Sequence, residues 1–381
     1  MKKILILGAG FGGLETATGL SSVLKENYQI TLIDQKDAFF VGFSKIDVLF
    51  GHRTEQQVKY RYENLRAEGV SFVQARVQSI DTEAKSVITT QGSFDYDYLV
   101  VALGAALDMQ AIPGFVESGG HEFYSMEGAV RLRPVLEEFK SGTLLMAIFK
   151  LPYKCPPAPY EVAYQIHDLF VRKGIRDAIR MKIVIPTPRP VDNPQVSEAL
   201  ENLLAERQIE LIPGTAISSI DASAKQAIAA GTTLDYDLLI GVPVHTPPEV
   251  IKLSNLGQQG YVPASPKNLE TSVPNVYAIG DVSSIPVGDK SVPKAGTFAE
   301  DAARTVVSDI LRKEGLVDAL VKFKAEGACY FELGGGQVAK VSSNYLGGEK
   351  PQVLYEGPSQ AFLSDKLEFE SSRRERWFKS E

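Results

Sequence analysis

The chain opens with a glycine-rich turn between an apolar strand and a helix. Apolar residues run from Ile4 to Leu7, and Gly8-Ala9-Gly10-Phe11-Gly12-Gly13 follows at once. Glycines in a G-x-G-x-x-G turn allow a sharp bend and bring a helix N-terminus against a pyrophosphate. The next strand, "YQITLID", ends at Asp34, at the distance from the last glycine (34 − 13 = 21) where an acid can bind a ribose. Together these features predict a dinucleotide-binding unit, with a helix from about Gly12 to Lys25.

An internal repeat indicates a second unit of the same kind. Ser79-Ile80-Asp81 recurs as Ser219-Ile220-Asp221, which gives an offset of 140 (219 − 79) in the numbering. Asp95-Tyr96-Asp97 recurs as Asp235-Tyr236-Asp237, and 235 − 95 is again 140. Each copy of the second motif precedes an apolar strand. The chain therefore reads as two related βαβ-type units, with the second inserted into the first.

The loop of the second unit has lost its glycines. The offset maps the glycine loop onto Ile148–Tyr153, which runs into "KLPYKCPPAPYE" (Lys150–Glu161), and neither stretch contains a glycine. Proline has no N–H, and side chains block the close approach that a pyrophosphate needs. The following strand, "MKIVIPTP", ends without an acid for a ribose or an arginine for a 2′-phosphate. We therefore expect a unit that keeps its fold, does not bind a nicotinamide nucleotide, and holds Cys155 near a helix N-terminus. That position and the adjacent Lys154 predict a lowered thiol pKa.

Composition narrows the class of protein. A chain of 381 residues is long enough for two or three domains, and its formal net charge of −7 argues against a nucleic-acid partner. No apolar run is long enough to span a membrane and no signal peptide is visible, so we expect a cytoplasmic protein. The two cysteines, Cys155 and Cys329, are far apart in sequence and lack metal-site spacing, and the histidines are scattered, so no metal is expected. On composition alone, the simpler interpretation is that both cysteines are small apolar residues buried in the core.

Two further segments favour FAD as the dinucleotide. "TSVPNVYAIGDVSS", with Gly280 and Asp281, resembles the second FAD fingerprint of flavoproteins that have two dinucleotide sites. The segment from Tyr98 to Ala106, with Gly104, resembles the strand that returns to the flavin in those proteins, although Leu103 stands where threonine is common. Paired with the glycine loop, these segments predict an FAD-binding unit.

Three motifs resemble those of the sulfide:quinone oxidoreductase and flavocytochrome c sulfide dehydrogenase family, within the FAD-linked disulfide oxidoreductase fold. "KCPPAPYE" is similar to the first redox cysteine loop of that family, and "GACYFELGGGQVAKV" to the second, with Cys329 in the matching place. "VPKAGTFAEDAAR" resembles the helix whose N-terminus points at the flavin. The resemblance spans nearly the whole chain, and the cysteine pair is its specific part.

The resemblance implies a redox-active Cys155–Cys329 pair beside the flavin, which sulfide attacks to give a persulfide. It also suggests Glu161 as an acid–base group and Lys294 as a stabiliser of reduced flavin, with a structural first-turn glutamate and a surface lysine as the alternatives. FAD should be non-covalent, because the stretch around Gly42 lacks the linking cysteine of the flavocytochrome branch. The predicted cofactor-binding residues are Gly8, Gly10, Phe11, Gly12, Gly13, Asp34, Gly104, Gly280, Asp281, Lys294, Ala295 and Gly296.

The expected architecture is α/β: two Rossmann-like units, the second inserted in the first, and a smaller C-terminal α+β domain. We predict a split FAD-binding domain over residues 1–107 and 253–313, the cysteine-bearing unit over 108–252, and the C-terminal domain with Cys329 and the acceptor interface over 314–381. "YFELGGGQVAKVSSNYLGG" in the last domain reads as a hairpin around glycines.

The leading functional hypothesis is sulfide oxidation, with electrons passing through FAD to quinone or to a small electron carrier such as cytochrome c. A type II NADH:quinone oxidoreductase, another FAD-dependent NAD(P)H or thiol oxidoreductase, and a non-enzymatic flavin redox sensor are the alternatives. The tail suggests peripheral contact with the inner membrane face, because it carries apolar residues beside arginines: Phe362, Leu363, Leu367, Trp377 and Phe378 with Arg373, Arg374 and Arg376. A terminal helix packed on the third domain is the alternative reading of the same residues.

Overall fold

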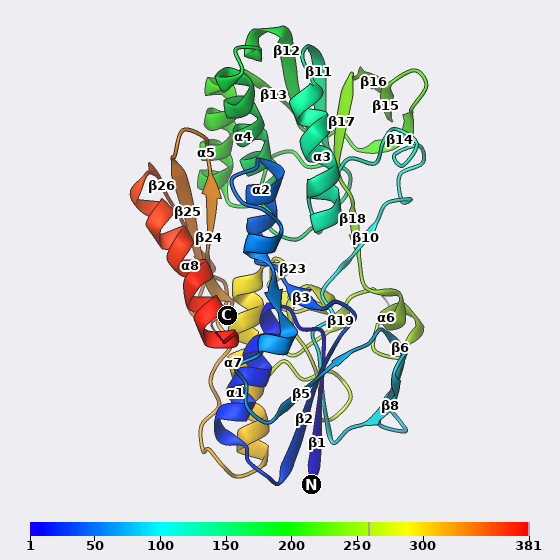
Figure 1. Ribbon diagram of the computed structural model, residues 1–381, viewed down its shortest axis with the longest axis vertical. Coiled ribbons are helices and arrows are strands. Elements are labelled where there is room, and N and C mark those ends of the chain that lie inside the picture. Colours follow the sequence, from blue (N-terminus) through cyan, green and yellow to red (C-terminus); the bar gives the residue numbers. More distant parts are fainter. Residues whose placement is uncertain (258–259, 380–381) are drawn as a thin grey trace.

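The first unit is built on a parallel sheet. The computed structural model describes residues 1–257 and 260–379 (Figure 1). The strand order is β20-β9-β1-β2-β5, and all pairs are parallel. The strands are β1 (Lys2–Leu7), β2 (Tyr28–Asp34), β5 (Val70–Gln74), β9 (Tyr98–Val101) and β20 (Val276–Ala278). The central strands are near-continuous apolar runs because both faces of a parallel sheet are covered. Helices α1 (Phe11–Val23) and α7 (Gly296–Lys313) lie side by side on one face.

The second unit repeats this plan in the upper part of Figure 1. Its parallel sheet has the order β13-β12-β11-β17. The strands are β11 (Gly142–Ile148), β12 (Ile179–Val184), β13 (Ile209–Ile212) and β17 (Leu238–Val242), and the helices are α3 (Met126–Glu138), α4 (Ala158–Arg172) and α5 (Pro194–Glu206). The predicted α/β fold with two Rossmann-like units is confirmed.

The internal repeat is confirmed at the level of strand register. Leu7 of β1 pairs with Val101 of β9, and Ala147 of β11 pairs with Gly241 of β17, each residue one offset later (7 + 140 = 147, 101 + 140 = 241). Matching three-stranded meanders precede β9 and β17. They are β6 (Val77–Asp81), β7 (Ser86–Thr89) and β8 (Gly92–Asp95), and β14 (Ile217–Asp221), β15 (Gln226–Ala229) and β16 (Thr232–Asp235).

Two antiparallel crossings join the units. Strand β10 (Ala106–Asp108) leaves the first unit and pairs with β18 (Val244–Thr246), on which the chain returns. The expected boundaries at residues 107 and 252 fall in or beside these crossings and stay predictions. The remaining short elements are β3 (Ala38–Phe39), α2 (Ser44–Leu49), β4 (Tyr60–Arg61), α6 (Glu249–Leu253), β19 (Val262–Pro263), β21 (Ser283–Ser284), β22 (Pro286–Val287) and β23 (Lys290–Ser291), with 3-10 turns at Gln56–Val58, Tyr62–Asn64, Arg176–Ala178 and Gly280–Val282.

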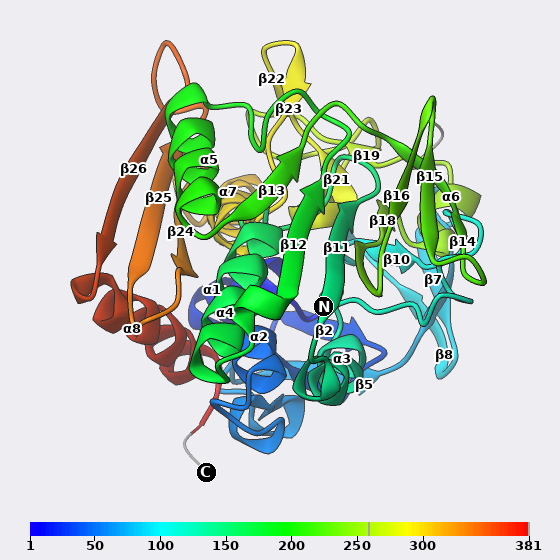
Figure 2. The same cartoon turned by 90° about the horizontal axis from the view of Figure 1, so that it is seen from above.

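The C-terminal layer is an antiparallel sheet with one long helix. Strands β24 (Glu326–Glu332), β25 (Val338–Asn344) and β26 (Gln352–Ser359) are followed by α8 (Ala361–Trp377). The predicted glycine hairpin joins β24 to β25. Figures 1 and 2 show this layer against both units: β24 packs on α4 and α7, and α8 packs on α1.

The tail packs on the protein rather than presenting its Trp-Phe pair to a membrane. Trp377 is fully buried, and its Nε1 donates to Glu15 Oε2 at 3.0 Å. Phe378 is 3% exposed and lies against Phe39 and Tyr60. The expectation that this pair forms a membrane interface is therefore wrong, because the FAD-binding unit offers an apolar site for both rings. Among the described residues, no helix combines the length and apolar character that crossing a bilayer requires.

Candidate active site

The glycine loop of the first unit is shaped by close backbone contacts. A Cβ on Gly13 would lie 1.8 Å from Gly8 O, and one on Gly8, which has φ +96°, would lie 2.3 Å from Ala102 O. A Cβ on Gly12 would meet Ile279 Cδ1 at 2.9 Å. Gly10 differs: it is the N-cap of α1, and a Cβ there would have no protein atom within 4 Å. The loop thus leaves open space beside the helix N-terminus, where an anion is favoured.

The other predicted residues of the first unit surround this loop. Asp34, at the end of β2, accepts hydrogen bonds from the N–H groups of Ala9 (2.7 Å) and Lys36 (2.9 Å). Gly104 and Gly280 have φ of +69° and +72°, which explains the choice of glycine at both turns. Sequence reasoning missed Tyr62, whose buried hydroxyl donates to Ala9 O at 2.9 Å. No local pattern marks this tyrosine, because only the tertiary fold brings it to the loop.

A cavity of about 270 Å³ lies where the two units and the C-terminal layer meet. Cys155 from the loop after β11 and Cys329 from β24 both line it as free thiols. The predicted residues Phe11, Asp281, Lys294, Ala295, Gly296 and Glu161 line it too, together with Phe39, Phe40, Gly42, Phe43, Lys45, Ile46, Phe123, Tyr124, Lys154, Ala158, Thr297, Ala328, Tyr330 and Phe369. The fold therefore brings two cysteines from distant parts of the sequence to one cavity.

The N-terminus of α7 forms one wall of this cavity. Ala295 is the N-cap, and a Cβ on Gly296 would meet the ring of Phe11 at 2.6 Å. The hydroxyl of Thr297 is buried and has no hydrogen-bond partner among the described residues. Lys294 points its ammonium at the carbonyls of Asp281 (2.6 Å) and Ser283 (3.2 Å), and burial lowers its pKa to about 8.

The cysteine loop is held by the FAD-binding unit. Cys155 has φ +53°, and its N–H donates to Lys294 O at 2.9 Å. Burial raises the pKa of Cys155 well above its usual range, and Cys329 and Glu161 add to the rise. Burial also raises the pKa of Cys329 to about 11, again with a contribution from Glu161. The expectation of a lowered Cys155 pKa is wrong. Desolvation of the thiol raises its pKa by more than the helix N-terminus and the nearby lysines lower it.

The second unit differs from the first at both positions that correspond to the glycine loop and to Asp34. The loop after β11 runs through Pro152, Pro156 and Pro157 before α4 begins at Ala158. Ile33 of β2 corresponds by register to Val184 of β12, so Ile185, which is 1% exposed, takes the place of Asp34. A buried isoleucine cannot accept hydrogen bonds from a ribose.

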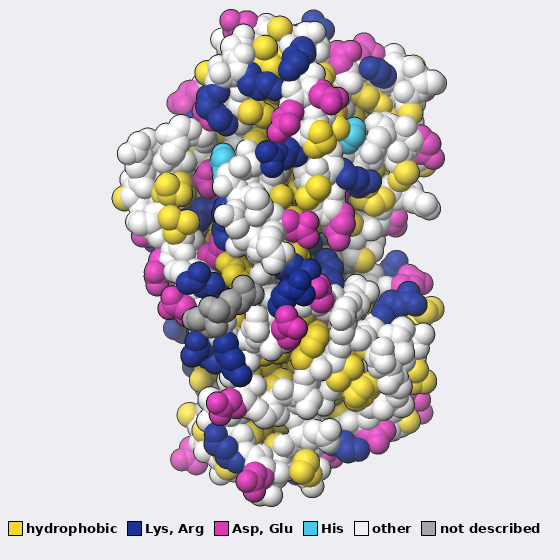
Figure 3. All heavy atoms as spheres, viewed as in Figure 1, with side chains coloured by type: hydrophobic (Ala, Val, Ile, Leu, Met, Phe, Trp, Pro, Cys, Tyr) yellow, Lys and Arg dark blue, Asp and Glu magenta, His cyan; other side chains and the backbone are white. Residues whose placement is uncertain are grey.

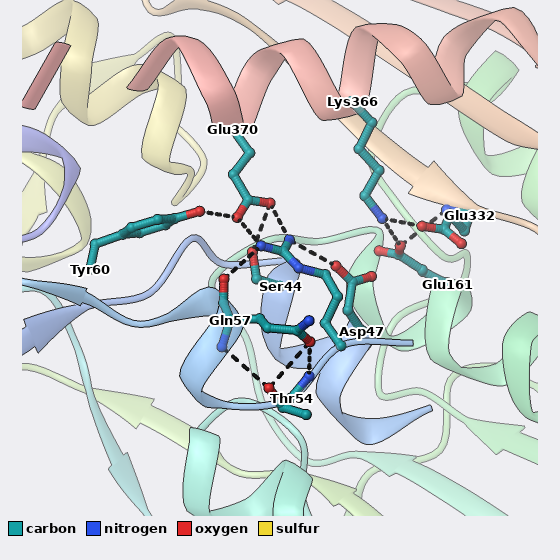
Figure 4. A network of polar contacts seen from close by, with 10 residues as sticks. Ser44, Asp47, Thr54, Gln57, Tyr60, Glu161, Glu332, Lys366 and Glu370 are labelled. Atoms are coloured by element: carbon teal, nitrogen blue, oxygen red, sulfur yellow. Dashed lines mark hydrogen bonds and ion pairs between the residues drawn. The ribbon is translucent and has the colours of Figure 1, made fainter. Parts of the chain in front are cut away.

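Glu161 joins a buried ion cluster that the sequence did not suggest. Lys366 of α8 contacts Glu161 Oε1 at 3.3 Å and Glu332 Oε1 at 2.6 Å, and Glu332 N–H donates to Glu161 at 3.1 Å (Figure 4). The side chains of Glu161 and Lys366 are 2% and 3% exposed. Burial raises the pKa of Glu161 to about 7, although Lys366 opposes the shift.

A second group in Figure 4 ties α8 to the segment that follows β3. Glu370 accepts hydrogen bonds from Arg53 (2.7 and 2.8 Å), Tyr60 (2.5 Å) and Ser44 (3.1 Å). Asp47 accepts from Arg53 at 3.4 Å and so extends the group along α2. The C-terminal helix is thus bonded to the FAD-binding unit at one turn and to the cysteine-bearing unit one turn earlier.

The fold and this site define an oxidoreductase with two dinucleotide-binding-type units and thiols at their junction. The family model described as pyridine nucleotide-disulphide oxidoreductase matches residues 2–141 and 160–303. The chain belongs to this family, which binds FAD, so the cofactor prediction is confirmed.

Individual relatives carry two different names. A mitochondrial sulfide:quinone oxidoreductase of Dictyostelium discoideum is 26% identical over 299 residues, which cover 74% of this chain and 66% of that protein, just under two thirds. A type II NADH:quinone oxidoreductase of Staphylococcus aureus is 28% identical over 341 residues, 82% of each chain. The crystal structure of the sulfide:quinone oxidoreductase from Aquifex aeolicus superposes with a TM-score of 0.87 at 22% identity, over 99% of this chain and 92% of that one.

The residues present fit FAD at both ends. Gly10 leaves room for a pyrophosphate at the α1 N-terminus, and Asp34 stands at the end of β2. The α7 N-terminus and the Thr297 hydroxyl, which has no partner among the residues that the structure describes, line the cavity and can hold the polar edge of a flavin ring. When bound, the flavin supplies two-electron redox chemistry beside the two cysteines.

Proposed function

We propose that this protein oxidises sulfide through a Cys155–Cys329 pair and passes the electrons by way of FAD to a quinone. The observation that carries the proposal is the placement of both cysteines on the wall of one cavity, next to the α7 N-terminus. The names of the relatives agree on quinone as the acceptor and differ on the electron donor.

The cysteine pair begins this chemistry as a disulfide. Hydrosulfide attacks one sulfur, so a persulfide S–S bond forms on that cysteine while the disulfide S–S bond breaks and the other cysteine leaves as a thiolate. A new S–S bond between the persulfide sulfur and the released thiolate would then form with loss of a proton and two electrons, and a bound flavin would take up these electrons for delivery to the quinone. Sulfide sulfur is thereby oxidised by two electrons, and the quinone is reduced by two.

Glu161 would move the proton in these steps. It lines the cavity with both cysteines and influences the pKa of each, and its own pKa of about 7 suits proton exchange near neutral pH. Lys294 would act from the α7 side of the cavity, with its ammonium anchored on backbone carbonyls. FAD would be non-covalent, since Gly42 lines the cavity and stands about where the resemblance places a linking cysteine.

NADH oxidation is the second candidate because the Staphylococcus aureus relative matches a longer part of the chain. The proline-rich loop and Ile185 argue against it, as neither offers the backbone approach or the acid that a nicotinamide nucleotide uses. A flavin redox sensor without turnover, another thiol donor, and cytochrome c as acceptor stay alternatives to the full proposal.

Membrane contact is proposed only for the face that the structure leaves free. Leu367 of α8 and Leu354 of β26 are 57% and 56% exposed, and Phe362 and Leu363 of α8 are partly exposed. In the view of Figure 3, hydrophobic side chains are interspersed with charged ones across the visible face. A peripheral contact at the inner membrane face would use this edge of the C-terminal layer.

The test is anaerobic bleaching of the visible absorbance of oxidised flavin. Purified holoprotein is mixed with sulfide or with NADH, in the wild type, Cys155→Ser and Cys329→Ser, with Ala328→Ser as a control that adds a hydroxyl to the same cavity wall. We expect rapid bleaching by sulfide in the wild type and the control, and none in the cysteine variants. Rapid bleaching by NADH with sulfide inert would refute the proposal and support the second candidate.

A further inference from the structure

Two lysines from different parts of the fold line the cavity on the Cys155 side. Lys45 lies on α2, and Lys154 immediately precedes Cys155. Their charges act on each other and on the thiol: Lys154 helps to lower the pKa of Lys45, and Lys45 favours the thiolate of Cys155. Neither lysine belongs to the glycine loop, the α7 terminus or the Glu161 cluster.

Neither lysine has an acidic partner in direct contact among the residues that the structure describes. Lys45 Nζ donates to the backbone oxygen of Tyr124 at 3.0 Å and forms no ion pair within 4 Å in the described part of the chain. Lys154 Nζ lies 5.9 Å from the centroid of the Tyr124 ring and makes no hydrogen bond to residues 1–257 or 260–379. Both lysines are half-buried, and cations withdrawn from water are normally paired, so two lysines without an ion pair at a cavity wall favour an anion there.

Glu122 favours the charged form of both lysines, but its carboxylate already accepts hydrogen bonds from other groups. Glu122 raises the pKa of Lys45 and of Lys154 through its charge, against the effect of burial. Asp281, which lines the same cavity, acts more strongly than Glu122 on Lys154 but forms no ion pair with it within 4 Å in the described part of the chain. It is 2% exposed and accepts the backbone N–H groups of Tyr124 (2.5 Å) and Ser125 (3.0 Å) as well as the Ser125 hydroxyl. These contacts fix the turn that enters α3. The Glu122 carboxylate therefore binds backbone N–H groups and does not contact either lysine directly.

Two buried polar groups beside the lysines also lack partners. Tyr124 lines the cavity, is 4% exposed, and its hydroxyl has no hydrogen-bond partner in the described part of the chain. The same holds for Nε2 of His245, whose ring centroid is 4.9 Å from that of Tyr124. Unsatisfied buried polar groups are costly, and their gathering next to two lysines that form no ion pair with any described residue favours a small polar ligand at this place.

We propose that Lys45 and Lys154 form an anion subsite beside Cys155, which admits the sulfur nucleophile as the hydrosulfide anion rather than as neutral hydrogen sulfide. The inference rests on the proposed function and names the form of substrate that the same cavity selects. The anion is the better nucleophile toward a disulfide, and two cations in a poorly solvated cavity raise its local concentration. They also stabilise the thiolate that leaves when the S–S bond breaks.

An anion would in turn keep both lysines charged. Burial lowers the pKa of Lys45 to about 7, and repulsion by Lys154 and Lys36 contributes. Burial also lowers the pKa of Lys154. A bound anion favours the protonated form of both ammonium groups, so the subsite takes up protons when it fills.

The test compares two alkylating probes of nearly equal size that differ in charge. The reduced holoprotein is treated with anionic iodoacetate or neutral iodoacetamide, and the rate at Cys155 is followed by peptide mass spectrometry. Lys45→Met and Lys154→Met should each lower the iodoacetate-to-iodoacetamide rate ratio about five- to tenfold, as expected for loss of one nearby charge. Lys150→Met, an exposed lysine of the same loop outside this cavity, should leave the ratio unchanged.

Three outcomes decide between the possibilities. A ratio that is unaffected in both cavity variants overturns the subsite. Loss of FAD from the Lys45 or Lys154 variants, measured by the flavin-to-protein absorbance ratio, would assign these lysines to the cofactor and overturn it too. The third outcome combines two results: both lysine variants lower the ratio, and sulfide does not bleach the flavin of the wild type. It would keep the anion subsite and refute sulfide as the substrate.

Discussion

The two Rossmann-like units share a strand register and differ in the loop that follows the first strand. In the first unit that loop is Gly8–Gly13 and leaves open space at Gly10; in the second it carries Cys155 between prolines. The sheets are the same because buried apolar strands and the turn signals around them recur at one constant offset. The comparison teaches that the sheet preserves the position of a site while a few loop residues decide which chemistry occupies it.

The two loops also differ in what holds them in place. The glycine loop is fixed by backbone contacts within its own unit. The cysteine loop depends on other parts of the chain: Lys294 O accepts the Cys155 N–H, and Lys366 of α8 pairs with Glu161 on the helix that follows the loop. Four predictions test this difference, beginning with the largest expected effect.

Lys366→Met should lower the free energy of unfolding by about 3–5 kcal/mol, because it leaves the buried Glu161 and the half-buried Glu332 without their cation. Thermal unfolding of the holoprotein measures the loss. The control is Lys340→Met, which removes a more exposed pair with Glu356 at 3.7 Å and should cost less than about 1 kcal/mol. Equal losses in the two variants would show that α8 does not hold the cysteine-bearing unit.

Glu161→Gln should flatten the dependence of stability on pH. The folded-state pKa of about 7 lies above the ordinary 4.5, so the folded protein binds the proton more tightly. This tighter proton binding adds up to about 3 kcal/mol to the free energy of unfolding. The stabilisation is complete below about pH 4.5 and is lost as the pH rises through about 7. Urea unfolding at a series of pH values checks this, with exposed Glu198→Gln as the control. An unchanged pH profile in Glu161→Gln would contradict the assignment.

Gly13→Ala and Gly10→Ala should separate folding from cofactor binding in the first unit. Gly13→Ala places a methyl 1.8 Å from Gly8 O and should cost about 1–3 kcal/mol of stability in the apoprotein. Gly10→Ala meets no protein atom, so we expect an apoprotein of wild-type stability whose FAD affinity is lowered at least about tenfold. Flavin titration measures the affinity, and Gly348→Ala is the neutral control. Normal FAD binding by Gly10→Ala would contradict the conclusion that the open space at Gly10 is used to bind the cofactor.

Asp97→Asn and Asp237→Asn should have similar, smaller effects. Asp97 Oδ2 accepts the N–H of Lys3 and Asp237 Oδ2 accepts that of Thr143, both at 2.7 Å, at repeat-related positions. Removing the charge should cost about 1 kcal/mol in each unit. Thermal unfolding of the two variants gives both values. Clearly different losses of stability in the two variants would mean that this hydrogen bond does not stabilise the two units equally, although their strands share one register.

Much of the fold was predictable because its signals are local and repeated. The glycine loop, Asp34 and the constant offset between the repeats each reflect a backbone requirement that only certain residues meet. Lys366, Tyr62 and Lys45 could not be found this way, since isolated polar residues acquire a role only when distant elements pack together. The sign of the Cys155 pKa shift was missed for a related reason: the position of a thiol near a helix is visible in the sequence, whereas its desolvation is not.

The pairing of β20 with β9 has a consequence for how the chain is made. Val101 ends β9, and its neighbour β20 does not begin until Val276, after the whole inserted unit. At about 5–20 residues per second, a ribosome needs roughly 10 to 35 seconds to supply the missing strand. During that interval β9 presents an unpaired edge, which other nascent chains can add to. Until β20 is made, the growing sheet therefore has an open edge at β9, and this edge can pair with another chain during biosynthesis.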